Sequence, residues 1–189
     1  MTHAVVMDDT LFFIDSAFKM RKLDIVDAET DTSLDRFSHS DLIIDRFPPL
    51  HPPSAAATSD NSFSGNNIDN TVFQFAYAFE YDDKTVSSWS PFSKSVMPAS
   101  TRDEDIIFPN NAIDVTIKTG TSRVNKIYIA YRKGESGNFA IAEKLDKTKL
   151  SIGDNTTYAY RFYNNKYSES IGDDQTTVIT NTANPFINA

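Results

Sequence analysis

The sequence has no cysteine, so it offers no disulfide framework, no thiolate nucleophile and no sulfur ligand for a metal. Its 6 glycines are scattered, and none forms a phosphate-cradling loop or the Gly-x-Ser-x-Gly turn of a serine hydrolase. Its 3 histidines, His3, His39 and His51, are far apart and do not stand at metal-ligand spacing. Since no carboxylate pair stands out either, we predict a protein that is not an enzyme and has no cofactor or metal.

Positive charge and long apolar runs are also scarce. The chain has 18 Lys plus Arg against 26 Asp plus Glu, a net charge of -8, whereas a nucleic-acid binder needs clustered cations. The early apolar runs 4–7 and 11–14 are separated by Asp8 and Asp9, so neither a signal peptide nor a spanning helix is predicted. We therefore expect no nucleic-acid, membrane or small-molecule partner and no export signal.

Aromatic side chains are abundant instead, with 14 Phe and 8 Tyr among 189 residues. They alternate with other residues in the stretch 72–81, where Phe73, Phe75, Tyr77, Phe79 and Tyr81 occupy every second position. Side chains on a strand point alternately to its two faces, so these rings line one face. The stretch is predicted to be a strand whose aromatic face belongs to the core.

The same alternation recurs along the rest of the chain. It appears at 113–117, 127–131 and 158–162, and residues 139–141 continue it, with turn signals at Gly120, 134–137 and Asn164-Asn165. Short strands at about ten-residue spacing are typical of a sandwich or barrel. We predict an all-β fold with a fibronectin-III/immunoglobulin-like β-sandwich at 71–175 and a tail at 176–189; a generic β-sheet domain is the alternative.

Two stretches repeat a pattern of aromatic strand, polar turn and serine-rich return. In the first, the strand and turn at 77–84 lead to Ser87, Ser88 and Ser90; in the second, the strand and turn at 160–166 lead to Ser168 and Ser170. Each is predicted to be a hairpin.

The first 70 residues differ from the rest. We predict an irregular, extended segment at 1–47, with either a short helix from Ala17 to about Val26 or a strand from Leu23 to Val26, and an extended piece at 41–47. Residues 48–70 are predicted to be a proline-rich linker followed by a polar loop from Ser54 to Asn67.

Five residues are candidates for interaction with a partner. Pro48, Pro49, Pro52 and Pro53 predict a stiff extended strip, which serves as a linker or docks with little loss of entropy. Trp89 is the only tryptophan. It is either a core or interface residue, the reading we favour, or part of a sugar-stacking platform with Tyr81.

Three stretches together resemble a known family. They are Asp45–Pro53, Val72–Pro91 and Arg161–Tyr167, with Asn111–Val115 and Lys126–Arg132 between them. In that order they resemble a large virion protein of the crAss-like short-tailed phages that infect Bacteroidota, described as a tail stabilisation or muzzle protein. The resemblance covers about residues 41–167, and the family's chains are much longer.

The resemblance implies a structural role. It implies a β-sandwich module in a phage tail or portal vertex, held in a ring by copies of itself and by other tail proteins, without catalysis. The chain would then be made in the host cytoplasm and act in the virion. The alternative function is a carbohydrate-binding or adhesion module for recognition of the host surface.

Overall fold

The computed structural model describes residues 4–14, 20–25, 47–99, 109–136, 138–166 and 169–171. The chain divides into two compact units, Met1–Arg46 and Phe47–Ala189. The described residues build antiparallel sheets, which confirms the predicted all-β class. The predicted tail at 176–189 and the extended piece at 41–46 lie outside the described residues.

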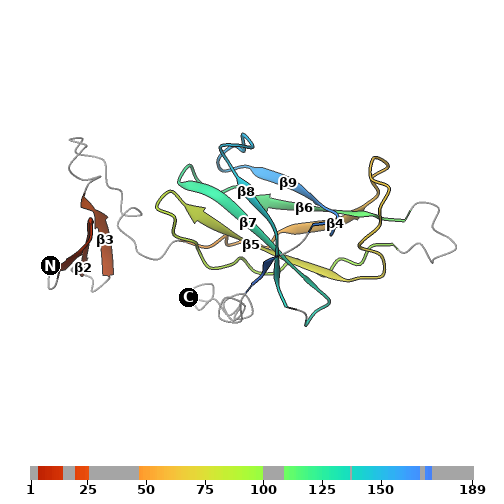
Figure 1. Ribbon diagram of the computed structural model, residues 1–189, viewed down its shortest axis with the longest axis horizontal. Coiled ribbons are helices and arrows are strands. Elements are labelled where there is room, and N and C mark those ends of the chain that lie inside the picture. The colour runs from red at the N-terminus through yellow and green to blue at the C-terminus, as the bar shows by residue number, and fades with distance from the viewer. Residues whose placement is uncertain are drawn as a thin grey trace. The chain divides into compact units, whose positions relative to one another are not determined.

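The first unit contains a three-stranded antiparallel sheet in the order β1-β2-β3 (Figure 1). Its strands are β1 Ala4–Met7, β2 Thr10–Ile14 and β3 Met20–Asp24. The predicted helix is therefore wrong over 20–24, and the alternative strand prediction gave the correct type but began too late. The reason is that Leu23 pairs with Leu11 of β2, and this pairing outweighs a weak helical stripe of three apolar residues.

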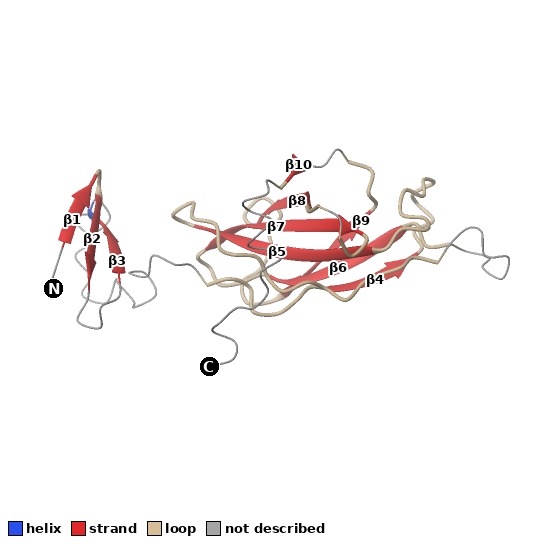
Figure 2. Cartoon of the chain, turned by 90° about the horizontal axis from the view of Figure 1, so that it is seen from below, coloured by secondary structure: helices blue, strands red, loops and turns tan. Residues whose placement is uncertain are grey.

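The second unit, which we call the sandwich unit, contains two antiparallel sheets (Figure 2). One has the order β4-β6-β9, with β4 Ser54–Thr58, β6 Ala112–Lys118 and β9 Thr157–Phe162. The other has the order β10-β8-β7-β5, with β5 Phe73–Tyr81, β7 Val124–Lys133, β8 Ala140–Asp146 and β10 Glu169–Ser170. Apolar side chains of both sheets share one buried cluster, so the two sheets pack face to face.

The predicted aromatic row of β5 lies in this core. Phe73 and Phe75 are fully buried, and Tyr77 is 1% exposed. Phe162 of the opposite sheet meets the rings of Phe73 and Phe75 edge-on, with centroid distances of 5.5 and 5.3 Å. Burial of each such ring contributes about 2 kcal/mol, so this row is a major source of the sandwich unit's stability.

The opposite face of β5 is buried as well. Ala76 and Ala78 are fully buried, and Glu80 is 5% exposed. Alternation predicted a core on the aromatic side only. A second buried cluster, which we call the outer cluster, covers the other side of the sheet; it consists of Ala76, Ala130, Phe139 and Ile171, with Trp89, Phe92 and Ile141 packed against them. The small alanines leave room for these rings.

Two loop and hairpin predictions are wrong. Ser54–Thr58 was expected in the polar loop but forms β4, which pairs with β6 while Ala55 and Ala57 face the core. A run of serine, alanine and threonine has the composition of a loop, and only the partner strand makes it a strand. The second hairpin does not form, since Ser170 of β10 pairs with Ala140 of β8 in the other sheet rather than with β9.

Candidate functional site

The segment that follows β5 returns antiparallel to it but is not a regular strand. Val86 forms an isolated bridge with Glu80, and Val96 forms another with Phe73. Between them, the backbone N–H groups of Ser87, Ser90 and Ser93 donate to the carbonyls of Phe79, Tyr77 and Phe75 at 2.8–2.9 Å. The segment therefore advances by three residues for every two residues of β5. The segment thus runs antiparallel to β5, as in the first predicted hairpin, but it is not a regular β-strand.

The serine side chains complete this pairing, and we call Ser87, Ser90 and Ser93 the serine ladder. Each hydroxyl accepts the backbone N–H of the β5 residue whose carbonyl the same serine already binds, at 3.0 Å in every case. Each hydroxyl also donates to the carbonyl of the next residue in its own segment, at 2.8–2.9 Å. Each serine thus binds both outward-facing backbone groups of its β5 partner. In a regular antiparallel ladder the backbone N–H and C=O of the facing residue make these two hydrogen bonds. Here the serine hydroxyl takes the place of the backbone C=O.

The three-residue period also places the aromatic side chains of the segment. The first position of each triplet faces the edge of β5, and the third position, held by Trp89 and then Phe92, packs on the outer cluster. Trp89 is therefore half-buried against Ala76, on the face of β5 opposite to Tyr81. The structure does not bring Trp89 and Tyr81 together into one platform.

A cationic side chain lies over this outer surface. Arg132 of β7 lies 4.9 Å above the ring of Phe92 and 5.2 Å from that of Phe139, and those two rings stack with centroids 5.1 Å apart. Its guanidinium also donates to the side chain of Gln74 at 2.8 Å. These contacts hold a charged group over the two rings and make the surface amphipathic.

The four prolines lie along the sandwich unit. Pro49 and Pro53 are buried, Pro48 is half-buried and Pro52 is exposed. The hydroxyl of Tyr81 donates to the carbonyl of Phe47 at 2.8 Å, which fastens the start of the strip to the end of β5. The strip is therefore docked on its own unit, directly before β4.

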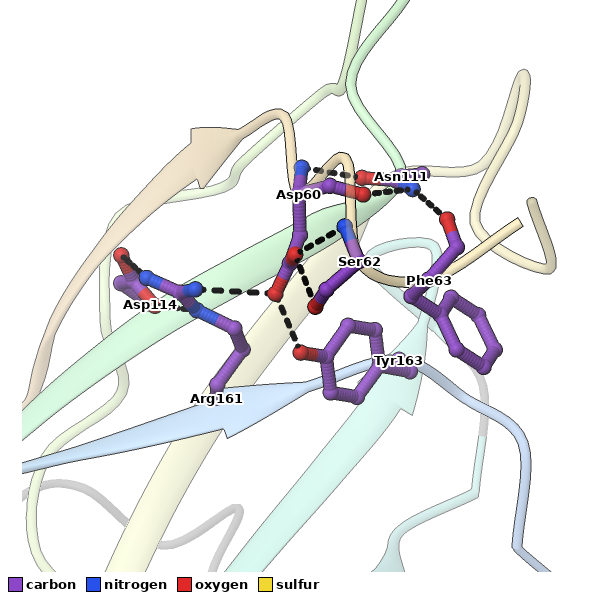
Figure 3. A network of polar contacts seen from close by, with 7 residues as sticks. All are labelled: Asp60, Ser62, Phe63, Asn111, Asp114, Arg161 and Tyr163. Atoms are coloured by element: carbon purple, nitrogen blue, oxygen red, sulfur yellow. Dashed lines mark hydrogen bonds and ion pairs between the residues drawn. The ribbon is translucent and has the colours of Figure 1, made fainter. Parts of the chain in front are cut away.

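A second polar cluster, which sequence reasoning missed, is centred on Asp60 (Figure 3). Its carboxylate accepts hydrogen bonds from the backbone N–H and hydroxyl of Ser62, from Arg161 at 3.0 Å and from the hydroxyl of Tyr163 at 2.6 Å. Arg161 also binds Asp114, its partner in the β6–β9 register, through two hydrogen bonds of 2.7 and 3.1 Å. We call Asp60, Ser62, Asn111, Asp114, Arg161 and Tyr163 the Asp60 network.

Asn111 extends the network to the loop backbone. Its side-chain amide donates to the carbonyls of Asp60 and Phe63 at 2.9 and 2.7 Å, and its side-chain oxygen accepts the N–H of Asp60 at 2.7 Å. The network thus ties the loop that follows β4 to the start of β6 and the end of β9. No sequence pattern pointed to it, because apart from Ser62 the partners Asn111, Arg161 and Tyr163 lie 51 or more residues away from Asp60.

The contacts of this network shift the pKa values of Asp60, Arg161 and Tyr163. Hydrogen bonds from Ser62, and then from Tyr163 and Arg161, hold the pKa of the Asp60 carboxyl well below its usual value. The bonds to Asp114 and Asp60 raise the pKa of Arg161 above its usual value, and the bond to Asp60 raises the pKa of Tyr163. These hydrogen bonds favour the charged forms of Asp60 and Arg161, and they hold the loop that follows β4 in place.

The structure describes one of the three histidines of the sequence. His51 is exposed, and His3 and His39 lie outside the described residues. Within the described ranges, no group of three or more His, Cys, Asp or Glu side chains could hold a metal ion. In the same ranges, no helix is long and apolar enough to cross a membrane.

Comparison with known proteins finds no matching protein-family model and no matching curated protein.

Proposed function

We propose that this chain is a structural component of a virion, placed in the tail or portal vertex of a crAss-like short-tailed phage. It acts by packing against other tail or portal proteins and against copies of itself, and it catalyses no reaction. The observation that carries the proposal is that the described residues of the three stretches that resemble the phage family all lie in the sandwich unit. The aromatic strand and the end of β9 contribute to its core, the serine segment lines the edge of β5, and the proline strip leads directly into β4.

Contacts between these stretches support the proposal. Tyr81, at the end of the aromatic strand, holds the proline strip through the carbonyl of Phe47 at 2.8 Å. Asn164, in the third stretch, donates to the carbonyl of Asn67 at 2.8 Å, in the loop that follows β4. The contact of Tyr81 with Phe47 joins the first and second stretches, and the contact of Asn164 ties the third stretch to the loop between them.

The rigidity of the sandwich unit also suits an assembly role. The unit has its own buried core, and its loops are tied down by the serine ladder and the Asp60 network. A preformed module loses little conformational entropy when it docks, so we infer that assembly joins folded units rather than folding them on contact.

We also propose the finer fold assignment, a fibronectin-III/immunoglobulin-like sandwich with permuted connectivity. In that architecture strands A, B and E belong to one sheet and C, F and G to the other. The order β4-β6-β9 matches A-B-E, and β7, β5 and the serine segment match C, F and G. Here β5 and the serine segment precede β6 in the chain instead of following β9.

The alternative function, glycan recognition, draws less support. A sugar-binding platform needs accessible rings on one surface, whereas Trp89 packs on the outer cluster and Tyr81 lies on the other face of β5.

The test is the protein content of purified particles. Virions are banded from the phage whose genome encodes this sequence, and their peptides are identified by mass spectrometry. We expect peptides of this chain at a constant ratio to the portal protein after repeated banding. Peptides found only in the soluble lysate would overturn the proposal. Retention of the purified chain on a glycan array, abolished by Trp89→Ala, would favour the alternative.

A further inference from the structure

The outer edge of β1 is unprotected among the residues that the structure describes. The sheet order is β1-β2-β3, so β1 pairs with β2 on one side only. All four of its residues are exposed, with Val5 at 55%, Val6 at 57% and Met7 at 62%. An apolar edge strand of this kind is a template for pairing with another chain.

Two other edges among the described strands carry devices that β1 lacks. The serine ladder covers the edge of β5 that faces away from β7. The strand β4 is immediately preceded by Pro52 and Pro53. The strand β1 has no charged residue, no proline and no irregularity in its register with β2. Since edges of monomeric proteins are commonly blocked in these ways, the contrast points to an edge that is used.

The hairpin register tells which backbone groups face outward. Asp8 and Asp9 form the turn, and Met7 pairs with Thr10 next to it. In a two-residue hairpin, the pair that closes the turn is hydrogen-bonded and the pairs then alternate. Met7 and Val5 thus bond to β2, whereas the N–H and C=O groups of Ala4 and Val6 point to the open edge.

We propose that two copies of this chain pair through β1, antiparallel, around a two-fold axis at Val5. Val6 of one copy then lies opposite Ala4 of the other, and each such pair exchanges its outward hydrogen bonds. Val5 lies opposite its own counterpart. The result is one continuous sheet in the order β3-β2-β1-β1-β2-β3, in which the exposed valines pack across the axis.

Charge favours this β1–β1 pairing over a head-to-tail pairing, in which β1 of one copy would pair with β3 of another. The other edge of the sheet, β3, carries Arg21, Lys22 and Asp24, so pairing with β3 would set charged residues beside the apolar strand. In the β1–β1 pairing the opposed residues Ala4, Val5 and Val6 are uncharged, and the two copies are complementary. The inference rests on the proposed function and deepens it by naming one assembly surface.

Cross-linking of the full chain tests the register. The protein has no cysteine, so Val5→Cys introduces a single thiol. Facing Val5 positions form a non-hydrogen-bonded pair about 4.5 Å apart between Cα atoms, within disulfide range. We expect Val5→Cys to form a disulfide-linked dimer on mild oxidation. The control Met7→Cys is equally exposed, but its two copies would lie roughly 14 Å apart along the paired strands, so we expect no comparable dimer.

Sedimentation of the unoxidised chain tests the interaction itself. We expect the wild type to form a dimer of the 21.2 kDa chain, and Val6→Pro, which removes an outward N–H without breaking the hairpin, to raise the dimer dissociation constant at least tenfold. Val6→Lys should act likewise, whereas Val86→Lys, at a valine 53% exposed in the sandwich unit, should not.

A wild type that stays monomeric at about 100 μM, or equal cross-linking of the Val5→Cys and Met7→Cys variants, would overturn the β1 pairing. Neither result bears on whether the chain is found in virions, so the particle measurement stays a separate test of the proposed function.

Discussion

Ser90 binds both outward-facing backbone groups of Tyr77. Its N–H donates to the Tyr77 carbonyl at 2.8 Å, and its hydroxyl accepts the Tyr77 N–H at 3.0 Å. The same arrangement joins Ser87 to Phe79 and Ser93 to Phe75. At the end of the ladder Val96 has no hydroxyl, and there Phe73 exchanges two ordinary backbone hydrogen bonds with Val96 at 2.9 Å. A serine at every third position is therefore what lets this segment close the edge of the sheet.

Loss of one ladder hydroxyl should destabilise the sandwich unit. Ser90→Ala leaves the N–H of Tyr77 without its acceptor at a buried position, because Ser90 is 1% exposed. We expect the free energy of unfolding to fall by about 1–3 kcal/mol, measured by urea denaturation. Ser88→Ala, at an exposed neighbour in the same segment, should change it by less than about 0.5 kcal/mol. Equal effects of the two substitutions would contradict the role of the hydroxyl.

The core position of the aromatic row gives a second prediction. Phe75 is fully buried and contacts Phe162 edge-on, so Phe75→Ala should cost about 3–5 kcal/mol of unfolding free energy. Phe47 is 63% exposed, and Phe47→Ala should change stability by less than about 0.5 kcal/mol, since only its backbone carbonyl is used by Tyr81. The midpoints of denaturant unfolding compare the two. A small loss for Phe75→Ala would mean that the row does not support the core.

The sequence predicted those strands whose side chains alternate between apolar and polar. The strands β5, β6, β7 and β9 were found this way, because a side-chain period of two is a local signal. The strand β4 was missed, since its alanines alternate in burial but not in composition. The strand β3 was ambiguous, because five residues with three charges fit a helix as well as a strand.

The contacts of the Asp60 network could not be predicted from the sequence, for a different reason. Asp60 and Tyr163 are separated by 103 positions, and their meeting depends on the register of β6 with β9. The serine ladder, in contrast, has a readable signal, a serine at 87, 90 and 93 directly after an aromatic strand. This signal was interpreted as a regular return strand, in which the side chains have a period of two. A segment that uses serine hydroxyls as acceptors has a period of three.

Two glycines with the same backbone conformation should respond differently to alanine. Gly120 and Gly134 have φ values of 68° and 71°, which L side chains rarely adopt. A Cβ at Gly120 would lie 2.8 Å from a methyl group of Val124 and 3.2 Å from the ring of Phe79, whereas one at Gly134 meets nothing within 4 Å. Gly134→Ala should cost roughly 1 kcal/mol, for the conformation alone, and Gly120→Ala about 2–4 kcal/mol. Thermal unfolding of both variants checks this, and the reverse order would contradict it.

The Asp60 network predicts acid sensitivity with a definite sign. The folded pKa of Asp60 is lowered from its ordinary value of 3.8, so its ionised form stabilises the folded state above that pH. This stabilisation is lost as the pH falls through and below the ordinary value, because the unfolded chain takes up the proton first. We expect the free energy of unfolding of the wild type to fall more steeply between about pH 5 and pH 2 than that of Asp60→Asn, which cannot titrate there. The control Glu135→Gln removes an exposed carboxylate outside the network, and it should keep the wild-type slope. Urea denaturation across that pH range decides, and parallel curves for wild type and Asp60→Asn would show that the network does not bind Asp60 preferentially in its charged form.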